Sequence, residues 1–139
     1  WEQMGGDINA EGDLDDFGLA VSLSADGKTV AIGASANDPT EDLVDAGHVR
    51  VYYYDEESDE WYQLGGEING EYYGYYGYGG ELGTGVSISS DGKTLAICAP
   101  YSHSNEVIDT SESLYCDISC IGHHYSLDRV HLTVDCSSC

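Results

Sequence analysis

The chain has 139 residues, of which 26 are Asp or Glu and only 4 are Lys or Arg, so its formal net charge at pH 7 is −22. This charge makes nucleic acid an unsuitable partner, because phosphate binding depends on clustered Lys and Arg. We expect no membrane insertion either, because the sequence has no run of about 18 or more apolar residues.

The chain contains an internal repeat, in which one sequence unit occurs twice. Residues 1–9 return as residues 61–69, and residues 16–34 return as residues 81–99, with a period of about 60–65 residues. A single unit of a repeat protein cannot bury its own apolar face, so about three or more units usually stack. The presence of two units therefore indicates that a neighbouring sheet completes the fold.

The first unit predicts four antiparallel strands. Small or apolar residues alternate with polar ones over residues 17–24, and Val30–Ala34 forms the return strand. Between them, Asp26-Gly27 favours a tight type I′ turn, which needs positive φ at both central residues. His48–Tyr54, rich in β-branched and aromatic residues, predicts a third strand, and Trp61–Leu64 predicts a fourth.

The second unit repeats the first two strands at residues 84–90 and 93–99. We expect its third strand at Arg129–Val134, after a Cys-rich insertion, and no fourth strand follows. The fourth-strand motif instead opens the chain as Trp1–Met4. We expect this segment to complete the second sheet of a neighbouring molecule, because adding a strand to an open sheet edge is a known mode of assembly.

Together these elements predict an all-β fold with two four-stranded antiparallel propeller-like blades and a Cys-rich C-terminal tail. The expected organisation is a donor strand at residues 1–5, a first blade repeat at 6–66, the first half of a second blade repeat at 67–100, and a Cys-rich insertion with the final strand at 101–139. A head-to-tail contact of this kind gives a ring if its rotation closes and a filament if it does not.

Four segments carry a family resemblance: Phe17-Gly18, Val21–Ser24, Val30–Ala34 and Gly47–Tyr52. They resemble the FG-GAP repeat, the blade unit of integrin-α-like β-propellers. The resemblance covers residues 1 to 100 and is weaker in the second unit, where Leu82-Gly83 replaces Phe-Gly. It implies extracellular adhesion, matrix contact or surface assembly rather than catalysis.

Blades of this family often bind Ca²⁺ through an Asp-x-Asp-x-Asp-Gly loop. The corresponding loops here hold one carboxylate each, Asp26 and Asp91, whereas Ca²⁺ takes about six to eight oxygen ligands. We therefore expect no cofactor, apart from weak Ca²⁺ uptake by the acidic loops at residues 38–45 and 55–60. The alternative for these loops is that they are solvated turns.

The most unusual segment is the Tyr- and Gly-rich stretch at residues 71–80. Tyr combines a flat apolar ring with a polar tip, which suits protein interfaces and stacking on sugars. The alternatives are an intermolecular patch, a glycan site, or a loop packed on its own domain. The residues predicted to form the intermolecular surface are Trp1, Gln3, Trp61, Tyr72, Tyr73, Tyr75, Tyr76, Tyr78, Val130 and Leu132.

The five cysteines indicate an oxidising, extracellular compartment, because four of them cluster in the last quarter of an acidic chain. They are Cys98, Cys116, Cys120, Cys136 and Cys139. Disulfides are the expected state, and zinc bound by cysteines together with His123 and His124 is the alternative. Because five is an odd number, one cysteine is either a thiol or bonded to another chain.

No nucleophile elbow, zinc-protease motif or phosphate loop occurs, so we do not expect an enzyme. The favoured function is an extracellular structural or adhesive subunit. It self-assembles head to tail, as a filament or ring, by β-strand complementation with Tyr-rich and disulfide contacts. The alternative is an adhesion or glycan-binding module of a longer β-propeller, with a glycan or matrix partner.

Overall fold

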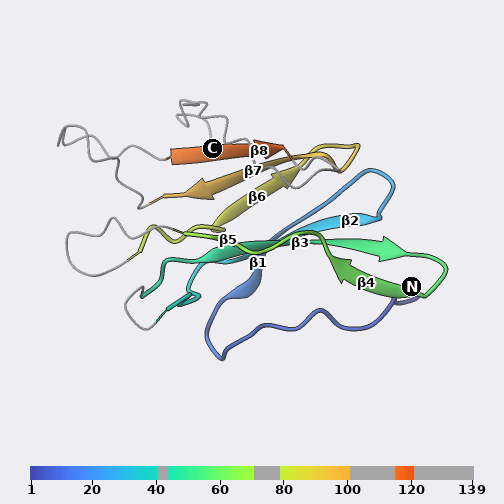
Figure 1. Cartoon of the computed structure of the whole chain (residues 1–139), viewed down its shortest axis with the longest axis horizontal. Coiled ribbons are helices and arrows are strands. Elements are labelled where there is room, and N and C mark those ends of the chain that lie inside the picture. The colour runs from blue at the N-terminus through green and yellow to red at the C-terminus, as the bar shows by residue number, and fades with distance from the viewer. Residues whose placement is uncertain (41–43, 71–78, 101–114, 121–139) are drawn as a thin grey trace.

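A computed structural model describes residues 1–40, 44–70, 79–100 and 115–120, the last of these as backbone alone. This part of the chain forms two antiparallel β-sheets and contains no helix, which confirms the all-β prediction. The two sheets lie one above the other in Figure 1. Within the described residues, no helix is long and apolar enough to cross a membrane.

The first sheet has the strand order β1-β2-β3-β4. Its strands are β1 (Phe17–Leu23), β2 (Thr29–Ala34), β3 (His48–Asp55) and β4 (Glu60–Gln63). They match the four predicted strands to within one residue at each end. A two-residue strand that was not predicted, β5 (Ile68–Asn69), pairs with the start of β3.

The second sheet has the order β6-β7-β8. Strands β6 (Gly85–Ile88) and β7 (Thr94–Ala99) lie within the predicted segments. The third strand is β8 (Tyr115–Cys120), which pairs with β7 along its whole length. This corrects the prediction that residues 115–120 belong to an insertion; the segment expected in that place, Arg129–Val134, lies outside the described residues.

The turn between the first two strands has the same hydrogen bonds in both units. Asp26 accepts bonds from the Ser24 hydroxyl and the Lys28 amide, and the Ser24 hydroxyl accepts a bond from the Thr29 amide. Ser89, Asp91, Lys93 and Thr94 repeat this pattern. These bonds hold the pKa of both aspartates below its ordinary value, and the bond from the serine hydroxyl has the largest effect.

The turn type differs from the expected type I′. Gly27 donates its N–H to the Ser24 carbonyl and has a φ of 73°, whereas Asp26 is not among the residues with positive φ. This is a type I turn followed by a left-handed glycine, a pattern used in longer hairpin loops. The aspartate favours this form because its carboxylate accepts a hydrogen bond from the backbone amide two residues later, that of Lys28.

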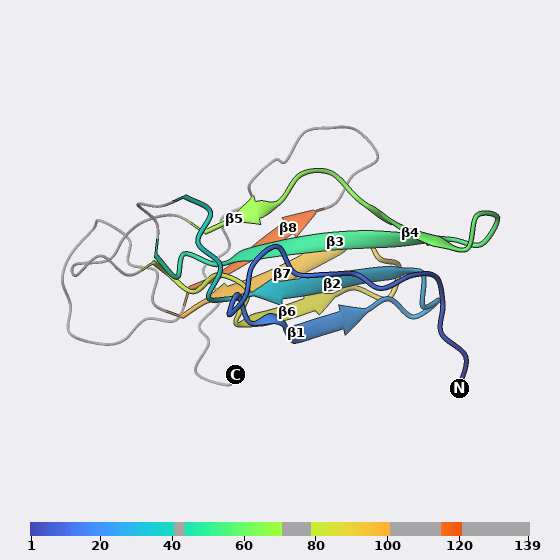
Figure 2. The same cartoon turned by 90° about the horizontal axis from the view of Figure 1, so that it is seen from below.

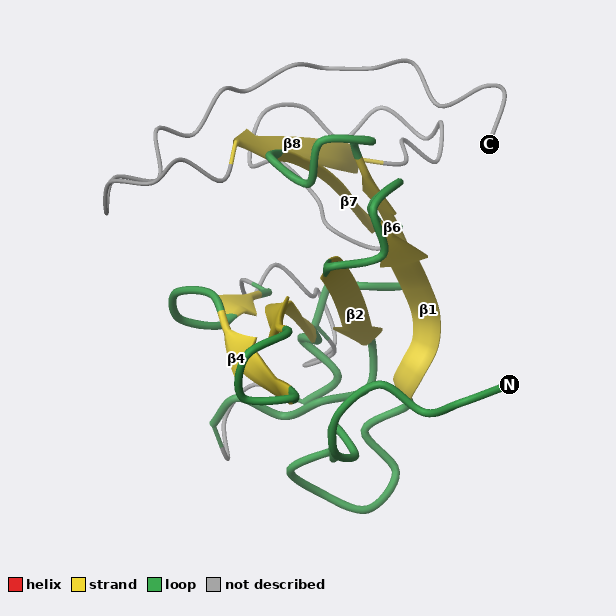
Figure 3. Ribbon diagram, turned by 90° about the vertical axis from the view of Figure 1, so that its right-hand side faces the viewer, coloured by secondary structure: helices red, strands yellow, loops and turns green. Residues whose placement is uncertain are grey.

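The main core lies between the two sheets, whose arrangement can be followed in Figure 3. Alternation along the strands places Ala31, Val49 and Val51 on one face of the first sheet, which we call the inner face. Against it pack side chains of the second sheet, chiefly Ile88, Leu95, Ile97 and Ala99. Leu95 and Ile97 have almost no exposed surface, so this layer contributes most of the hydrophobic stabilisation.

A close backbone contact sets the spacing between the sheets at one end. A Cβ added to Gly33 of β2 would lie 2.1 Å from the carbonyl oxygen of Gly83, which precedes β6. No side chain fits at this distance, so Gly33 is required by the close approach rather than by its own dihedral angles. Leu82 forms a bridge with Gly47 beside this contact.

Trp1–Met4 does not form a strand within the chain. The Met4 carbonyl accepts a bond of 2.8 Å from the Trp61 indole N–H, and Gly5 donates to Asp59. Met4 and Gly5 therefore lie beside the β3–β4 hairpin, whereas the N-terminus itself extends away from β4, as Figure 2 shows. The following segment crosses the sheet face that points away from the second sheet, where Ile8 packs against a small cluster of buried side chains.

The Gly33 contact can be tested by substitution. We expect Gly33→Ala to lower the free energy of unfolding by about 3 kcal/mol, at the upper end of the cost of overpacking, because its neighbour is rigid backbone. Gly6→Ala is the matched control, since a Cβ there would meet nothing within 4 Å. Urea unfolding would measure both; equal stability of the two variants would contradict the contact.

Candidate functional site

The face of the first sheet that points away from the second sheet is only partly covered, and we call it the open face. Val21 pairs with Ile32, and Leu23 pairs with Val30, so all four side chains lie on this face. Leu19 lies in the irregular stretch between Phe17 and Ala20, where it has no partner in the register, but exposed and less exposed residues alternate from Leu19 to Leu23. Along β1 the exposed fractions are 66% for Leu19, 57% for Val21 and 55% for Leu23. Three exposed apolar side chains at alternate positions of one strand form a stripe of the kind that marks an interaction surface.

The covered part of the open face is a second hydrophobic cluster. Val30, Ile32 and Tyr52 are buried there beneath Ile8, Phe17 and Trp61. Ile8 comes from the N-terminal segment, which crosses this region in Figure 2. The N-terminal segment thus covers the middle of the open face and leaves its β1 edge exposed to solvent.

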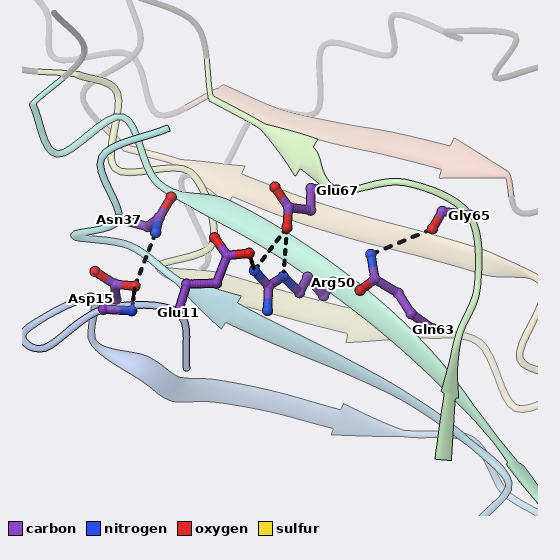
Figure 4. Close-up of polar contacts among 8 residues, drawn as sticks. Glu11, Asp15, Asn37, Arg50, Gln63, Gly65 and Glu67 are labelled. Carbon is purple, nitrogen blue, oxygen red and sulfur yellow. Dashed lines mark hydrogen bonds and ion pairs between the residues drawn. The ribbon is translucent and has the colours of Figure 1, made fainter. Parts of the chain in front are cut away.

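A buried charged cluster lies on the same face, toward the start of β3. Arg50 pairs with Ile32, and its side chain is 6% exposed. Its guanidinium contacts the Oε1 atoms of two carboxylates, Glu11 of the N-terminal segment and Glu67 before β5 (Figure 4). The Glu67 oxygen lies 2.8 Å from Nη2 and 3.0 Å from Nε. The arginine therefore joins three segments that are far apart in the sequence.

His48 lies two residues before Arg50 on the same face and is 1% exposed. Neither ring nitrogen has a hydrogen-bond partner among the described residues. Burial, followed by the nearby Arg50 charge, lowers its pKa, so the ring is neutral at pH 7. The Phe17 ring packs edge-on against His48 and lies 5.8 Å from the Arg50 guanidinium carbon.

Glu11, His48 and Glu67 each offer a ligand atom, and these atoms lie within 4.8 Å of one another. Asp15 lies close enough to act electrostatically on His48, and it accepts bonds from Asn37 and the Gly12 amide (Figure 4). Sequence reasoning missed this group because His48 and Arg50 were read only as strand residues. A charged residue within an otherwise buried strand was the available signal, since such a residue needs a partner.

The predicted intermolecular residues divide into two groups. Trp1 is fully exposed, Gln3 bonds to Gly5 and Asp7, and Trp61 is half-buried between Met4 and Tyr54. The others, Tyr72, Tyr73, Tyr75, Tyr76, Tyr78, Val130 and Leu132, lie outside the described residues.

Two of the five cysteines lie opposite each other. Cys98 of β7 and Cys116 of β8 are direct partners in the antiparallel register. The Cys98 carbonyl accepts a bond from Gly83 and so points away from β8. The two cysteines therefore form a non-hydrogen-bonded pair, for which a Cα separation of about 4.5 Å is usual and falls within the disulfide range. Cys120 faces Thr94 in the same register, whereas Cys136 and Cys139 lie outside the described residues.

The acidic loops are partly engaged in local bonds. Asp59 accepts bonds from the Tyr54 hydroxyl and the Gly5 amide, and Asp55 accepts bonds from Ser58 and Glu57. Asp38 accepts a bond from the Asp45 amide. These carboxylates therefore shape their own loops, and the prediction of weak Ca²⁺ uptake stays a prediction.

Comparison of the chain with family models, with curated proteins and with solved structures gives no match. The resemblance to FG-GAP blades therefore stays a prediction from the motifs.

Removal of the buried cation should be more costly than removal of a surface one. We expect Arg50→Met to lower the free energy of unfolding by about 2–3 kcal/mol, somewhat below the loss typical of a fully buried pair because both glutamates are partly exposed. Lys28→Met is the control, because solvent screens the exposed Lys28–Glu56 ion pair and such surface pairs add little to stability. Similar losses measured by urea unfolding would contradict the assignment.

The lowered pKa of His48 predicts a pH dependence of stability. Because the folded state binds a proton at His48 less readily than the unfolded chain does, stability should fall as pH drops below about 6.5. The slope from one such group is at most about 1.4 kcal/mol per pH unit. His48→Gln should flatten the profile between about pH 7 and 5.5; an unchanged slope in urea titrations would show that His48 is not responsible.

Proposed function

We propose that the chain is an extracellular structural or adhesive subunit that assembles head to tail with further copies of itself through β-sheet contacts. The observation that carries this proposal is the exposed apolar stripe of β1 on the open face. A sheet face of this composition gains stability when another sheet covers it. The rest of the open face, which holds the second hydrophobic cluster and the Arg50 ion pairs, is buried and supports β1 from beside it.

The way the two sheets stack supports a head-to-tail arrangement. Leu95, Ile97 and Ala99 of the second unit correspond to Val30, Ile32 and Ala34 of the first. In the second unit these residues pack on the inner face of the first sheet, whereas in the first unit they lie on the open face. The equivalent residues of the two sheets therefore point the same way. The open face of one copy can accordingly pack on another copy's second sheet, on the face of that sheet that points away from its own first sheet.

The sheet edges support the same direction of growth. Strand β8 is the last strand of the second sheet, and its outer edge is unpaired within the described residues. Trp1–Met4 repeats the motif that forms β4 in the first unit. We infer that in the assembly it leaves Trp61 and pairs with the β8 edge of a neighbour, as an added strand. The tyrosine-rich segment and a disulfide between copies are further candidate contacts in this proposal.

One residue prevents the contact between copies from being identical to the Gly33–Gly83 contact between the two sheets of one chain. Cys98 corresponds to Gly33, and Gly18 corresponds to Gly83. A Cβ at Gly33 would overlap Gly83, so Cys98 must hold the Gly18 backbone of a neighbouring copy farther away. This favours, as a second candidate, an adhesion or glycan-binding module of a longer propeller. In that arrangement the open face is covered by a sheet of a different sequence, which has glycine at the position equivalent to Gly33 and Cys98.

The apolar stripe is the part to test by mutation. We expect Val21→Ser combined with Leu23→Ser to weaken self-association by about tenfold or more, because each half-exposed side chain contributes about 1 kcal/mol when covered. Leu14→Ser is the control, since Leu14 is 90% exposed and lies outside the sheet. Sedimentation velocity would measure both.

Unchanged association of the double variant would contradict a role of the open face. Deletion of Trp1–Met4 separates the two candidate functions. It should abolish self-association of the structural subunit, whereas binding by a module of a longer propeller should survive it.

A further inference from the structure

We propose that Glu11, His48 and Glu67 form a zinc site that fastens the N-terminal segment to the first sheet. The three residues come from the N-terminal segment, from β3 and from the connection between β4 and β5. Their ligand atoms already lie within 4.8 Å of one another. In a tetrahedral zinc site with bonds of about 2.1 Å, neighbouring ligand atoms are about 3.4 Å apart, so small side-chain movements close the site.

His48 distinguishes this group from an ordinary acidic surface cluster. It is 1% exposed, and both of its ring nitrogens lack a hydrogen-bond partner among the described residues. Leaving a buried polar group without a partner costs about 1–3 kcal/mol, and a metal ion bound to one nitrogen would remove part of this cost. Imidazole is the commonest metal-binding side chain in proteins.

Arg50 is compatible with the metal because it uses one oxygen of each carboxylate. Its contacts are with Oε1 of Glu11 and Oε1 of Glu67, so Oε2 of each remains for a metal ion. Hydrogen bonds of this kind orient ligating carboxylates in many metal sites. Arg50 is therefore a positioning residue rather than a competitor.

The local charge suits a divalent cation. Glu11, Asp15 and Glu67 carry three negative charges, and Arg50 carries one positive charge, so the group has a net charge of −2 while His48 is neutral. Zinc accepts mixed imidazole and carboxylate ligands, whereas Ca²⁺ and Mg²⁺ prefer oxygen ligands alone. The ligand set therefore favours zinc over Ca²⁺ and Mg²⁺.

Zinc at this position would control the N-terminal segment. Glu11 is 54% exposed and lies in the segment that carries Ile8 across the open face. A bound ion would hold that segment in place and keep Trp1–Met4 close to its own β4. The effect on assembly rests on the proposed function, but metal binding itself does not.

The test is zinc binding to the full-length chain, measured by competition with a chromophoric chelator after alkylation of the cysteine thiols. We expect one zinc ion per chain, with the affinity lowered at least about tenfold in Glu11→Gln and Glu67→Gln. Glu11→Gln should fold normally because Glu11 is half exposed. Glu60→Gln, on exposed β4, is the matched control and should bind zinc as the wild type does.

A second measurement locates the ion. Zinc should slow amide hydrogen exchange of residues 5–16 in the wild type and leave the exchange in Glu11→Gln unchanged. Equal zinc affinity of wild type, Glu11→Gln and Glu67→Gln, or the absence of any zinc effect on residues 5–16, would overturn the site. Neither readout depends on whether the chain self-associates.

Discussion

The backbone contact between Gly33 and Gly83 is the constraint on which the arrangement of the two sheets depends. It lets the chain before β6 approach β2 so closely that no side chain can stand between them. The core residues Leu95 and Ile97 can then reach the inner face of the first sheet and become almost completely buried. Interiors tolerate few voids, so the spacing at the glycine and the fit of these side chains are linked.

The way the sheets stack at this contact also makes the two faces of the first sheet different. Equivalent side chains of the two units point the same way, so the second sheet covers the first while the first sheet has an open face. That face is not uniform: Ile8 and Trp61 cover its centre, Arg50 and His48 lie beneath its polar end, and the β1 stripe is exposed. A partner must therefore match both an apolar strip and a fixed acidic border. Self-association at a net charge of −22 also carries a repulsive term, which salt screens.

Much of the fold was predictable because the strands and hairpins depend on short stretches of sequence with recognisable patterns. Strands β1 to β4 follow from alternation and from β-branched and aromatic runs, and the Ser-x-Asp-Gly-Lys-Thr segments mark both hairpins. The turn type was wrong because the Ser24 and Asp26 side chains supply bonds that a two-residue turn lacks. Strand β8 was missed because Tyr115–Cys120 has no counterpart in the motif of the third strand, and its pairing with β7 depends on tertiary context.

The charged cluster shows the limit of local reasoning. Arg50 lies 17 residues from Glu67, and Glu11 comes from the other end of the first unit. Only the folded sheet brings their side chains together around His48. The stripe at Leu19, Val21 and Leu23 was visible as alternation, but alternation alone does not say that the face it predicts is left uncovered.

The most direct test of the central claim is the native mass of the purified chain, measured by sedimentation equilibrium over a range of concentrations, with and without reductant. Head-to-tail assembly predicts a mass above 15.0 kDa that rises with concentration. A loss of mass on reduction would assign a cysteine to the contact between copies. A single 15.0 kDa species at every concentration, in low and high salt, would contradict self-assembly and leave the open face to a different protein.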